Sequence, residues 1–264
     1  IGERFKAQKY SIPKPLINIL GKPILFWLLD NLHFVESTII CIPYVRELKT
    51  FRFEDLLLQK YPRLSFVFKC LEKKTNGAVE TIKIGLEELK RRNINDESIL
   101  CLDGDNFYNI DIIRQWNQNN QIFAVEDNTS RTCFSFIQFD DETKVIINLE
   151  EKKRISNYAC TGAYGFKSWK TLNSMCEHVL QNELKVIGEF YTSSLICEMM
   201  KQCDQTFSAK ILNNSDWICL GTPMDLVIFN EQTEFETKQR YCFDLDNTLV
   251  SFPRKHDDYS SVVP

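Results

Sequence analysis

Strand-length apolar runs alternate with segments of helical period along the first half of the chain, and this alternation limits the folds open to it. Short runs rich in β-branched or aromatic residues predict buried strands at residues 37–42, 64–68, 98–102 and 121–125. The segments between them predict helices at residues 24–32, 53–60, 78–91 and 110–117. In the third helix, Val79, Ile82 and Leu86 fall on one face. Strands and helices that take turns predict a parallel sheet with helices on both faces.

The second half has a different pattern, which adds antiparallel pairing. Residues 133–139 and 144–149 are predicted to pair across a polar turn. Further strands are predicted at residues 158–166, 207–212 and 218–220, and further helices at residues 169–181 and 191–201. We therefore expect an α/β fold, a Rossmann-like three-layer sandwich with a mixed, mostly parallel central sheet.

Composition narrows the class of protein. The 264 residues are 44% hydrophobic, which suits one large domain or one and a half, and the net charge of −4 argues weakly against bulk binding of nucleic acid. The ten cysteines include no C-x-x-C pair and lie mostly in apolar runs, which predicts free thiols in a reducing, cytosolic compartment. No apolar stretch approaches the ~20 residues of a membrane span, and the charged first ten residues are unlike a signal peptide.

The first residues carry glycine and cationic side chains in a pattern that suits phosphate binding. The segments are Gly2-Glu3-Arg4-Phe5, Pro13-Lys14-Pro15-Leu16 and Gly21-Lys22-Pro23-Ile24. Glycine lets the backbone approach phosphate oxygens, and arginine or lysine neutralises their charge. A surface loop whose Lys-Pro pairs only mark turns explains the same residues equally well.

These segments, in this order and together with Tyr10, resemble the signature of nucleotidyltransferases that make nucleoside-diphosphate sugars. The resemblance implies the nucleotidyltransferase fold, which is similar to that of GT-A glycosyltransferases. It also implies that Gly2, Arg4 and Lys14 bind the nucleoside triphosphate, and that Arg4 and Lys14 are catalytic. In that family a strand and a glycine-rich loop precede the arginine, so we expect residues 1–230 to form this domain without its first strand.

Two further segments match what the resemblance implies for the nucleotide and the metal. Asn76 and Gly77 precede a predicted helix, where the family places a loop that touches the base and ribose; an ordinary helix cap is the alternative. Asp103 and Asp105 follow a buried strand, at the sheet edge where open α/β sheets bind ligands. Asp105 is the expected Mg²⁺ ligand, and Asp103 is expected to lie beside the nucleotide.

The acceptor side is implied by a lysine that follows a glutamate. Glu151 and Lys152, ahead of Thr161 and Gly162, resemble the family's sugar-phosphate pocket, where the lysine holds the phosphate and the glutamate accepts sugar hydroxyls. A solvated charged face is the alternative for this polar stretch. Lys152 is therefore the fourth expected catalytic residue, after Arg4, Lys14 and Asp105.

One position departs from the family. Alignment on Gly221 and Thr222 places Cys219 where a second metal-binding aspartate usually stands. Since a thiol is a poor ligand for Mg²⁺, we expect one of three outcomes. One carboxylate suffices with the substrate phosphates, a neighbour such as Asp103 or Asp225 substitutes, or activity is weakened.

The end of the chain carries a separate motif. After a polar stretch at residues 231–240, expected to be a linker, Asp244 and Asp246 follow an apolar strand in a D-x-D-x-T-L sequence. This motif resembles the opening of HAD-type phosphatases, so residues 241–264 are expected to be the first strand and motif of an incomplete domain. The combination resembles proteins encoded in capsular-polysaccharide gene clusters.

The function implied is Mg²⁺-dependent synthesis of a nucleoside-diphosphate sugar from a nucleoside triphosphate and a sugar 1-phosphate, with release of pyrophosphate. The expected partners are thus a nucleoside triphosphate and a phosphorylated small molecule, and oligomeric assembly is left open. The alternatives are a GT-A glycosyltransferase, a cytidylyltransferase for a non-sugar phosphate such as phosphocholine, and a non-catalytic nucleotide-binding module.

Overall fold

A computed structural model of the chain describes residues 3–94, 98–129, 131–203 and 205–232. Its contacts divide the chain into two compact units, residues 1–230 and 231–264. Of the second unit only Glu231 and Gln232 are described. The linker and the phosphatase-like segment remain predictions, because Asp244 and Asp246, like Gly2, lie outside the described residues.

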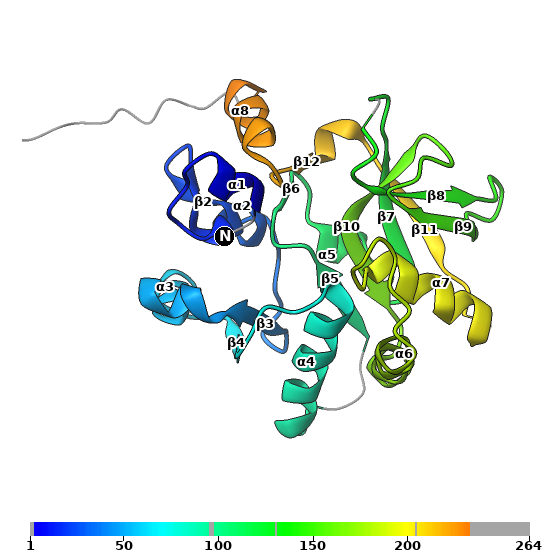
Figure 1. Ribbon diagram of the computed structural model, residues 1–264, viewed down its shortest axis with the longest axis horizontal. Helices are drawn as coiled ribbons and strands as arrows, with labels where there is room; N and C mark the ends of the chain where they lie inside the picture. Colours follow the sequence, from blue (N-terminus) through cyan, green and yellow to red (C-terminus); the bar gives the residue numbers. More distant parts are fainter. Residues whose placement is uncertain (1–2, 95–97, 130, 204, 233–264) are drawn as a thin grey trace, which may run out of the picture. The chain divides into compact units, whose positions relative to one another are not determined.

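Helices and strands follow one another largely as predicted (Figure 1). The helices are α1 (Glu3–Ala7), α2 (Ile24–Leu29), α3 (Phe53–Lys60), α4 (Ala78–Arg91), α5 (Ile112–Gln115), α6 (Trp169–Gln181), α7 (Thr192–Gln202) and α8 (Pro223–Gln232). The strands are β1 (Asn18–Ile19), β2 (Lys22–Pro23), β3 (Ile39–Val45), β4 (Ser65–Leu71), β5 (Ile99–Leu102), β6 (Asn106–Tyr108), β7 (Gln121–Glu126), β8 (Ser135–Phe139), β9 (Ile146–Glu151), β10 (Tyr158–Phe166), β11 (Ser208–Leu212) and β12 (Trp217–Cys219). Helix α5 is shorter than expected, and α1 and α8 were not predicted.

The central sheet of the described chain has six strands, in the order β11-β7-β10-β8-β9 with β5 also paired to β10. Strand β11 runs parallel to β7, whereas β10 is antiparallel to β5, β7 and β8. The mixed sheet is confirmed, but most of its pairings are antiparallel. The reason is that β5, β7 and β11 share one direction, as the strand–helix alternation predicts, while the long β10 runs between β5 and β7 in the opposite direction. Strands β3 and β4 form a separate parallel pair.

Strand β7 shows why the molecule has three layers. Ile122 and Ala124 belong to a buried cluster with residues of α4, α6 and α7. Phe123 and Val125 belong to a second buried cluster with residues of α2, α3 and α5. Since successive side chains of a strand point to opposite faces, the sheet is covered by helices on both faces, as a continuous apolar run indicates.

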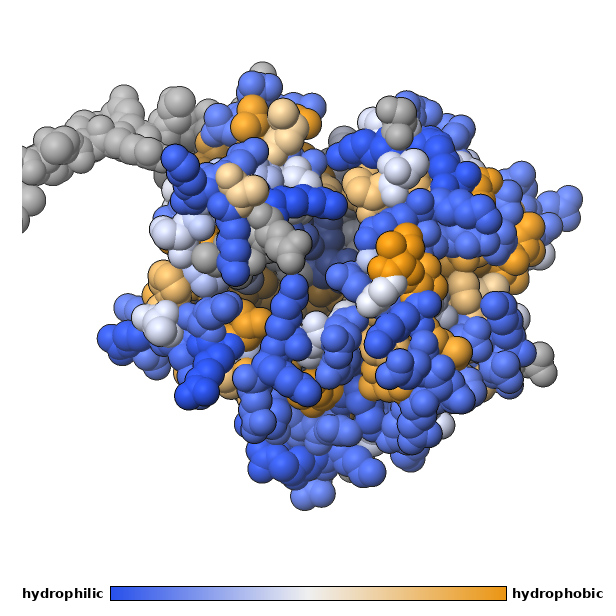
Figure 2. All heavy atoms as spheres, in the orientation of Figure 1, coloured by the Kyte–Doolittle hydropathy of each residue, from blue (hydrophilic) through white to orange (hydrophobic). Residues whose placement is uncertain are grey.

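A third apolar cluster positions the first helix. Phe5 is buried there with Trp27 and Phe229, and the rings of Trp27 and Phe229 lie 5.1 Å apart, edge to face. This packing holds α1, which carries Arg4, beside the first turns of α8. Met224 and Val227 of α8 are exposed, and hydrophobic and polar residues lie side by side over this helix in Figure 2. None of the described helices is both long and apolar enough to cross a lipid bilayer.

Candidate active site

One cleft in the first unit collects most of the residues that the sequence singled out. Its volume is about 420 Å³, and it opens near the middle of the face shown in Figure 2. The predicted residues that line it are Arg4, Lys14, Asp103, Asp105, Glu151, Lys152, Thr161 and Gly162. Cys219 lines it as well. Asn76 and Gly77 do not, although the next residue, Ala78, does.

Lys14 and Asp105 meet in this cleft across 91 positions of sequence. The ammonium of Lys14 forms an ion pair with the carboxylate of Asp105 and donates a hydrogen bond of 2.9 Å to the carbonyl of Gly221. Asp105 is held in turn through its backbone, because its carbonyl accepts a hydrogen bond of 2.7 Å from the N–H of Leu220. The segment after β12 therefore fixes both members of the pair.

Asp103 directly follows β5. Together with Asp105 it forms one side of the cleft, called the acidic wall below. Its N–H donates to the carbonyl of Gly162 at 2.8 Å. Although solvent reaches its side chain from the cleft, the surrounding protein desolvates the carboxyl, and Asp105 adds like charge; together they raise the pKa of Asp103 well above its ordinary value. A bound cation would relieve this repulsion.

Gly162 allows β10 to pass close to that wall. Its φ is +79°, in the left-handed region. A Cβ at this position would lie 2.6 Å from Oδ2 of Asp103 and 2.6 Å from Nδ2 of Asn106. Glycine is required here by contact with the protein's own acidic wall, which adds a structural reason to the one predicted from the sugar pocket.

Glu151 ends β9 with its carboxylate held by two hydroxyl groups. Ser135 and Ser193 both donate hydrogen bonds to Oε2, the second at 2.7 Å. Sequence reasoning did not identify either serine, since a lone serine in a strand or helix carries no signal of its own. Both serines line the cleft, so Glu151 is presented on a fixed polar wall.

Lys152 is held in an unusual backbone conformation. Its φ is +52°, and its N–H donates to the carbonyl of Phe134 at 3.0 Å. Its ammonium donates a hydrogen bond to the hydroxyl of Tyr191 and lies 4.5 Å from the centroid of that ring. Partial burial opposes the charged form, but Tyr191 and the carboxylates of Glu151 and Glu189 outweigh it and raise the pKa of Lys152. The side chain is therefore a cation at neutral pH.

Thr161 lines the cleft with its hydroxyl already engaged. The hydroxyl donates to the carbonyl of Phe123 at 3.1 Å, and the carbonyl of Thr161 accepts from the hydroxyl of Tyr108 at 2.8 Å. Its side chain is almost fully buried. The structure thus gives Thr161 a role in joining β10 to β7 and β6, and its predicted contact with a sugar phosphate stays a prediction.

Asn76 and Gly77 form the turn before α4, and the protein itself fills the space beside them. The N–H and side-chain amide of Asn76 donate to the carboxylate of Glu80 at 2.6 and 3.0 Å. Gly77 has a φ of +140°, and a Cβ there would lie 2.5 Å from the carbonyl oxygen of Phe190. This close approach is to the backbone before α7. The predicted contact of this turn with a base and ribose remains untested.

Position 219 carries a neutral thiol beside the Lys14–Asp105 pair. The N–H of Gly221 donates to Sγ of Cys219 at 3.3 Å. Burial, together with the carboxylates of Asp105 and Asp225, raises the pKa of Cys219 to about 12. The thiol consequently offers no negative charge where the family resemblance places a carboxylate.

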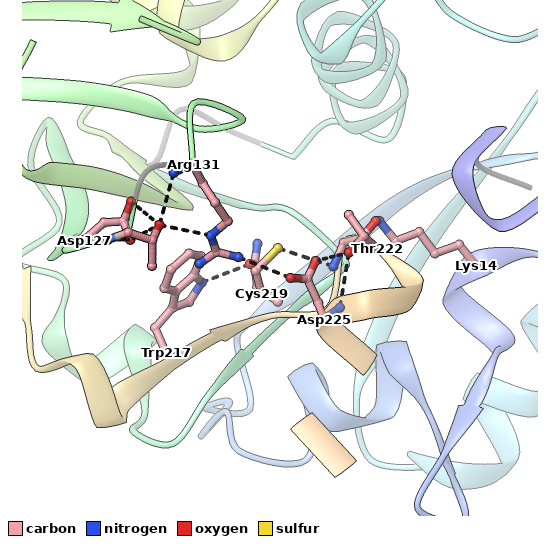
Figure 3. A network of polar contacts seen from close by, with 10 residues as sticks. Lys14, Asp127, Arg131, Trp217, Cys219, Thr222 and Asp225 are labelled. Carbon is pink, nitrogen blue, oxygen red and sulfur yellow. Dashed lines mark hydrogen bonds and ion pairs between the residues drawn. The ribbon is translucent and has the colours of Figure 1, made fainter. Parts of the chain in front are cut away.

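Asp225, one of the possible substitutes for that carboxylate, is engaged by other residues (Figure 3). Its Oδ2 accepts a hydrogen bond of 2.7 Å from the hydroxyl of Thr222, and its Oδ1 forms an ion pair of 3.2 Å with Arg131. Arg131 also contacts Thr129, whose hydroxyl donates to Asp127. Sequence reasoning missed Arg131, because an arginine in a polar loop is usually solvated.

The lining fits a magnesium ion that substrate phosphates help to hold. Among the residues that the structure describes, no group of three or more His, Cys, Asp or Glu side chains could hold a metal ion alone. Mg²⁺ prefers oxygen ligands and often takes one or two carboxylates with phosphates and waters. Asp105, with Asp103 near it on the same wall, meets that smaller requirement.

Fold and cleft together define an α/β protein with the nucleotidyltransferase fold, in which cations and carboxylates line the same polar cleft. The chain belongs to the nucleotidyl transferase family, whose model matches residues 1–236.

Individual relatives are distant. The bifunctional protein GlmU of Methanocaldococcus jannaschii is 24% identical over 233 residues, which are 87% of this chain and 51% of GlmU. The chain thus spans about half the length of that relative. Among solved structures, a nucleoside-diphosphate-sugar pyrophosphorylase of Vibrio cholerae superposes with a TM-score of 0.77 at 20% identity, over 88% of this chain and 97% of that one. The CTP:phosphocholine cytidylyltransferase of Streptococcus pneumoniae gives 0.63 at 18% identity, over 87% and 93%. These likenesses support the fold.

Proposed function

We propose that this chain transfers a nucleotidyl group from a nucleoside triphosphate to a sugar 1-phosphate, with release of pyrophosphate. One observation carries the proposal: a single cleft holds Lys14 on Asp105 in one part of its lining and Lys152 beside Glu151 in another. The first group suits a triphosphate, and the second suits a phosphorylated acceptor with hydroxyl groups. Membership of the family supports the reaction class.

The reaction needs little proton chemistry from the protein. An oxygen of the sugar phosphate, already ionised at neutral pH, attacks the α-phosphorus of the triphosphate. The bond from that phosphorus to the bridging oxygen breaks, and pyrophosphate leaves with the electron pair. Arg4 and Lys14 would neutralise the triphosphate, and Lys152 would place the attacking phosphate. When bound, Mg²⁺ would be held by Asp105 and would neutralise phosphate charge.

Two alternative functions can be compared with the proposed one. A GT-A glycosyltransferase is disfavoured by the family match and by the presence of Arg4 and Lys14 in the cleft. A phosphorylated amino alcohol such as phosphocholine is the second candidate acceptor, because Tyr191 and Glu189 line the cleft beside Lys152 and an aromatic ring with a carboxylate suits an ammonium group. A role in capsule synthesis, and the assignment of residues 241–264 to the opening of a phosphatase domain, rest on sequence resemblance alone.

Pyrophosphate release across a panel tests the proposal. ATP, CTP, GTP, UTP and dTTP would each be combined with Mg²⁺ and with sugar 1-phosphates or phosphocholine. We expect release with at least one sugar 1-phosphate. Release only with phosphocholine would favour the second candidate, and release of a nucleoside mono- or diphosphate from a nucleotide sugar, without pyrophosphate, would overturn both.

Lys152→Ala tests the acceptor site itself. Loss of a charge-assisted hydrogen bond should raise the KM for the phosphorylated acceptor about ten- to a hundred-fold, with a small change in the KM for the triphosphate. Lys153→Ala is the matched control, since Lys153 is exposed and pairs with Glu150 outside the cleft. Equal effects of the two substitutions would remove the role given to Lys152.

A further inference from the structure

We propose that Lys14 is the resident cation of Asp105 in the free protein, so that a divalent metal binds with the nucleoside triphosphate and not before it. The proposal rests on the proposed function for the identity of the nucleotide. It concerns the order and affinity of metal binding, which neither the family match nor the relatives address.

The first step is that a metal ion must compete with an ammonium group. Lys14 forms an ion pair with Asp105 and is held there by the carbonyl of Gly221 at 2.9 Å. Both side chains are only partly exposed, at 21% and 33%. A divalent ion on Asp105 would therefore face a nearby positive charge in a partly desolvated place, where like charges repel more strongly than in water.

The second step is that position 219 carries a thiol where the family resemblance places a second carboxylate. A Cβ atom added to Gly221 would lie 3.0 Å from Sγ of Cys219 and 3.3 Å from Oδ2 of Asp105. The thiol and the carboxylate therefore lie on the same side of Gly221. Sulfur is a poor ligand for a hard cation such as Mg²⁺.

The third step removes Asp225 as a substitute. Both of its oxygens are occupied, Oδ2 by Thr222 and Oδ1 by Arg131. Its side chain is buried, and the guanidinium of Arg131 lies over the ring of Phe134 at 4.9 Å. A metal ion on Asp225 would have to displace this arginine first.

The triphosphate resolves the competition. Its oxygens provide new partners for Lys14 and Arg4, which line the same cleft, and so draw the ammonium of Lys14 from Asp105. The same oxygens bring ligands for the metal, which then needs only one carboxylate from the protein. The metal ion and the nucleotide consequently bind to the protein together.

Binding of Mn²⁺ alone tests this arrangement without any turnover. Loss of the free-ion EPR signal would be measured on titration of the full chain with Mn²⁺, in the absence of nucleotide. Lys14→Met should bind Mn²⁺ at least about five-fold more tightly than the wild type, because the competing charge is gone. Lys22→Met, which removes a lysine paired with Asp30 outside the cleft, should bind as the wild type does.

A second substitution keeps the test independent of Lys14. Cys219→Asp restores a carboxylate and should bind Mn²⁺ alone about ten-fold more tightly than the wild type, whereas Cys219→Asn should not. If the wild type alone binds Mn²⁺ as tightly as Lys14→Met and Cys219→Asp, through Asp103 and Asp105 for example, the proposal is overturned. Circular dichroism would show whether each variant folds; if one does not, the other decides.

Failure of the proposed function gives a different result. Thermal stabilisation of the wild type by each nucleoside triphosphate with Mg²⁺ would be measured in parallel. Absence of stabilisation by all of them would contradict the nucleotide site, while the Mn²⁺ affinities of Lys14→Met and Cys219→Asp would still report on the competition at Asp105.

Discussion

Gly162 illustrates how a single residue shapes the cleft. Its left-handed φ and its contact with Asp103 and Asn106 both require the absence of a side chain. The backbone requirement alone does not distinguish it from Gly188, whose φ is +82° but whose missing Cβ would meet nothing within 4 Å. Substitution of Gly188 would therefore report backbone strain alone, whereas substitution of Gly162 would report strain together with contact with Asp103 and Asn106.

Gly162→Ala should lower the free energy of unfolding by about 2 kcal/mol and abolish thermal stabilisation by the triphosphate with Mg²⁺. The added methyl group would push Asp103 and Asn106 out of place. Gly188→Ala should cost only about 1 kcal/mol, from the strained φ, and keep nucleotide binding. Thermal unfolding with and without nucleotide measures both effects; a nucleotide response retained by Gly162→Ala would contradict this account.

At the scale of a single element, helix α4 ends with a carboxylate where the helix dipole disfavours one. Glu88 is buried, yet it accepts hydrogen bonds from Arg91 at 2.5 Å and Arg92 at 2.9 Å. These guanidinium groups lower the pKa of Glu88 to about 2. The arginines shield the carboxylate from solvent and satisfy it, so the last turn is stable despite the unfavourable dipole.

Glu88→Gln should destabilise the protein at neutral pH by about 1 kcal/mol, a modest value because the arginines are exposed. The folded pKa lies below the ordinary value of 4.5, so the contribution is present above that pH and is lost as pH falls toward 2. Urea unfolding of the wild type and variant at several pH values should therefore show a difference that shrinks in acid. Glu87→Gln, at an exposed neighbour, is the control; a difference that grows in acid would contradict the assignment.

At the scale of the whole molecule, the described cysteines differ in how far solvent reaches their thiols. The nine described cysteines are all free, as predicted, and most are buried or half-buried. Cys133 and Cys203 are exposed, but they lie in different places: Cys133 lines the cleft, and Cys203 directly follows the last residue of α7. Their reactivity thus reports separately on the cleft and on the outer surface.

A nucleoside triphosphate with Mg²⁺ should slow alkylation of Cys133 several-fold and leave that of Cys203 unchanged. Partial burial raises the pKa of the Cys133 thiol, so its labelling should speed up as the pH of the reaction is raised, because the thiolate is the reactive form. Mass spectrometry of iodoacetamide-treated protein gives both rates. Equal protection of the two thiols would indicate general stabilisation of the fold and would argue against nucleotide in this cleft.

The order of strands and helices was readable from the sequence alone, because periodicity and apolar runs are local properties. Helices α3, α4 and α6 have the predicted bounds. Lys14, Asp105 and Lys152 were also predicted to lie at one site, because their segments resemble those of the nucleotidyltransferase family, and all three line the cleft. Asn76 and Gly77 were placed beside the right helix, α4, and the ligand contact predicted for them stays a prediction.

Long-range pairing was decided only by the tertiary structure. The insertion of β10 between β5 and β7 sets the strand directions, and no local pattern specifies which strand becomes a neighbour. The same holds for Lys14 on Asp105 and for Arg131 on Asp225, pairs 91 and 94 residues apart. The sequence indicated the charged groups Lys14, Asp105 and Lys152 of the cleft, because their segments carry recognisable motifs, but not Ser135 and Ser193. Which of these side chains form ion pairs or hydrogen bonds with one another depends on the packing that brings distant segments together. That packing pairs Lys14 with Asp105 and places a neutral Cys219 beside them.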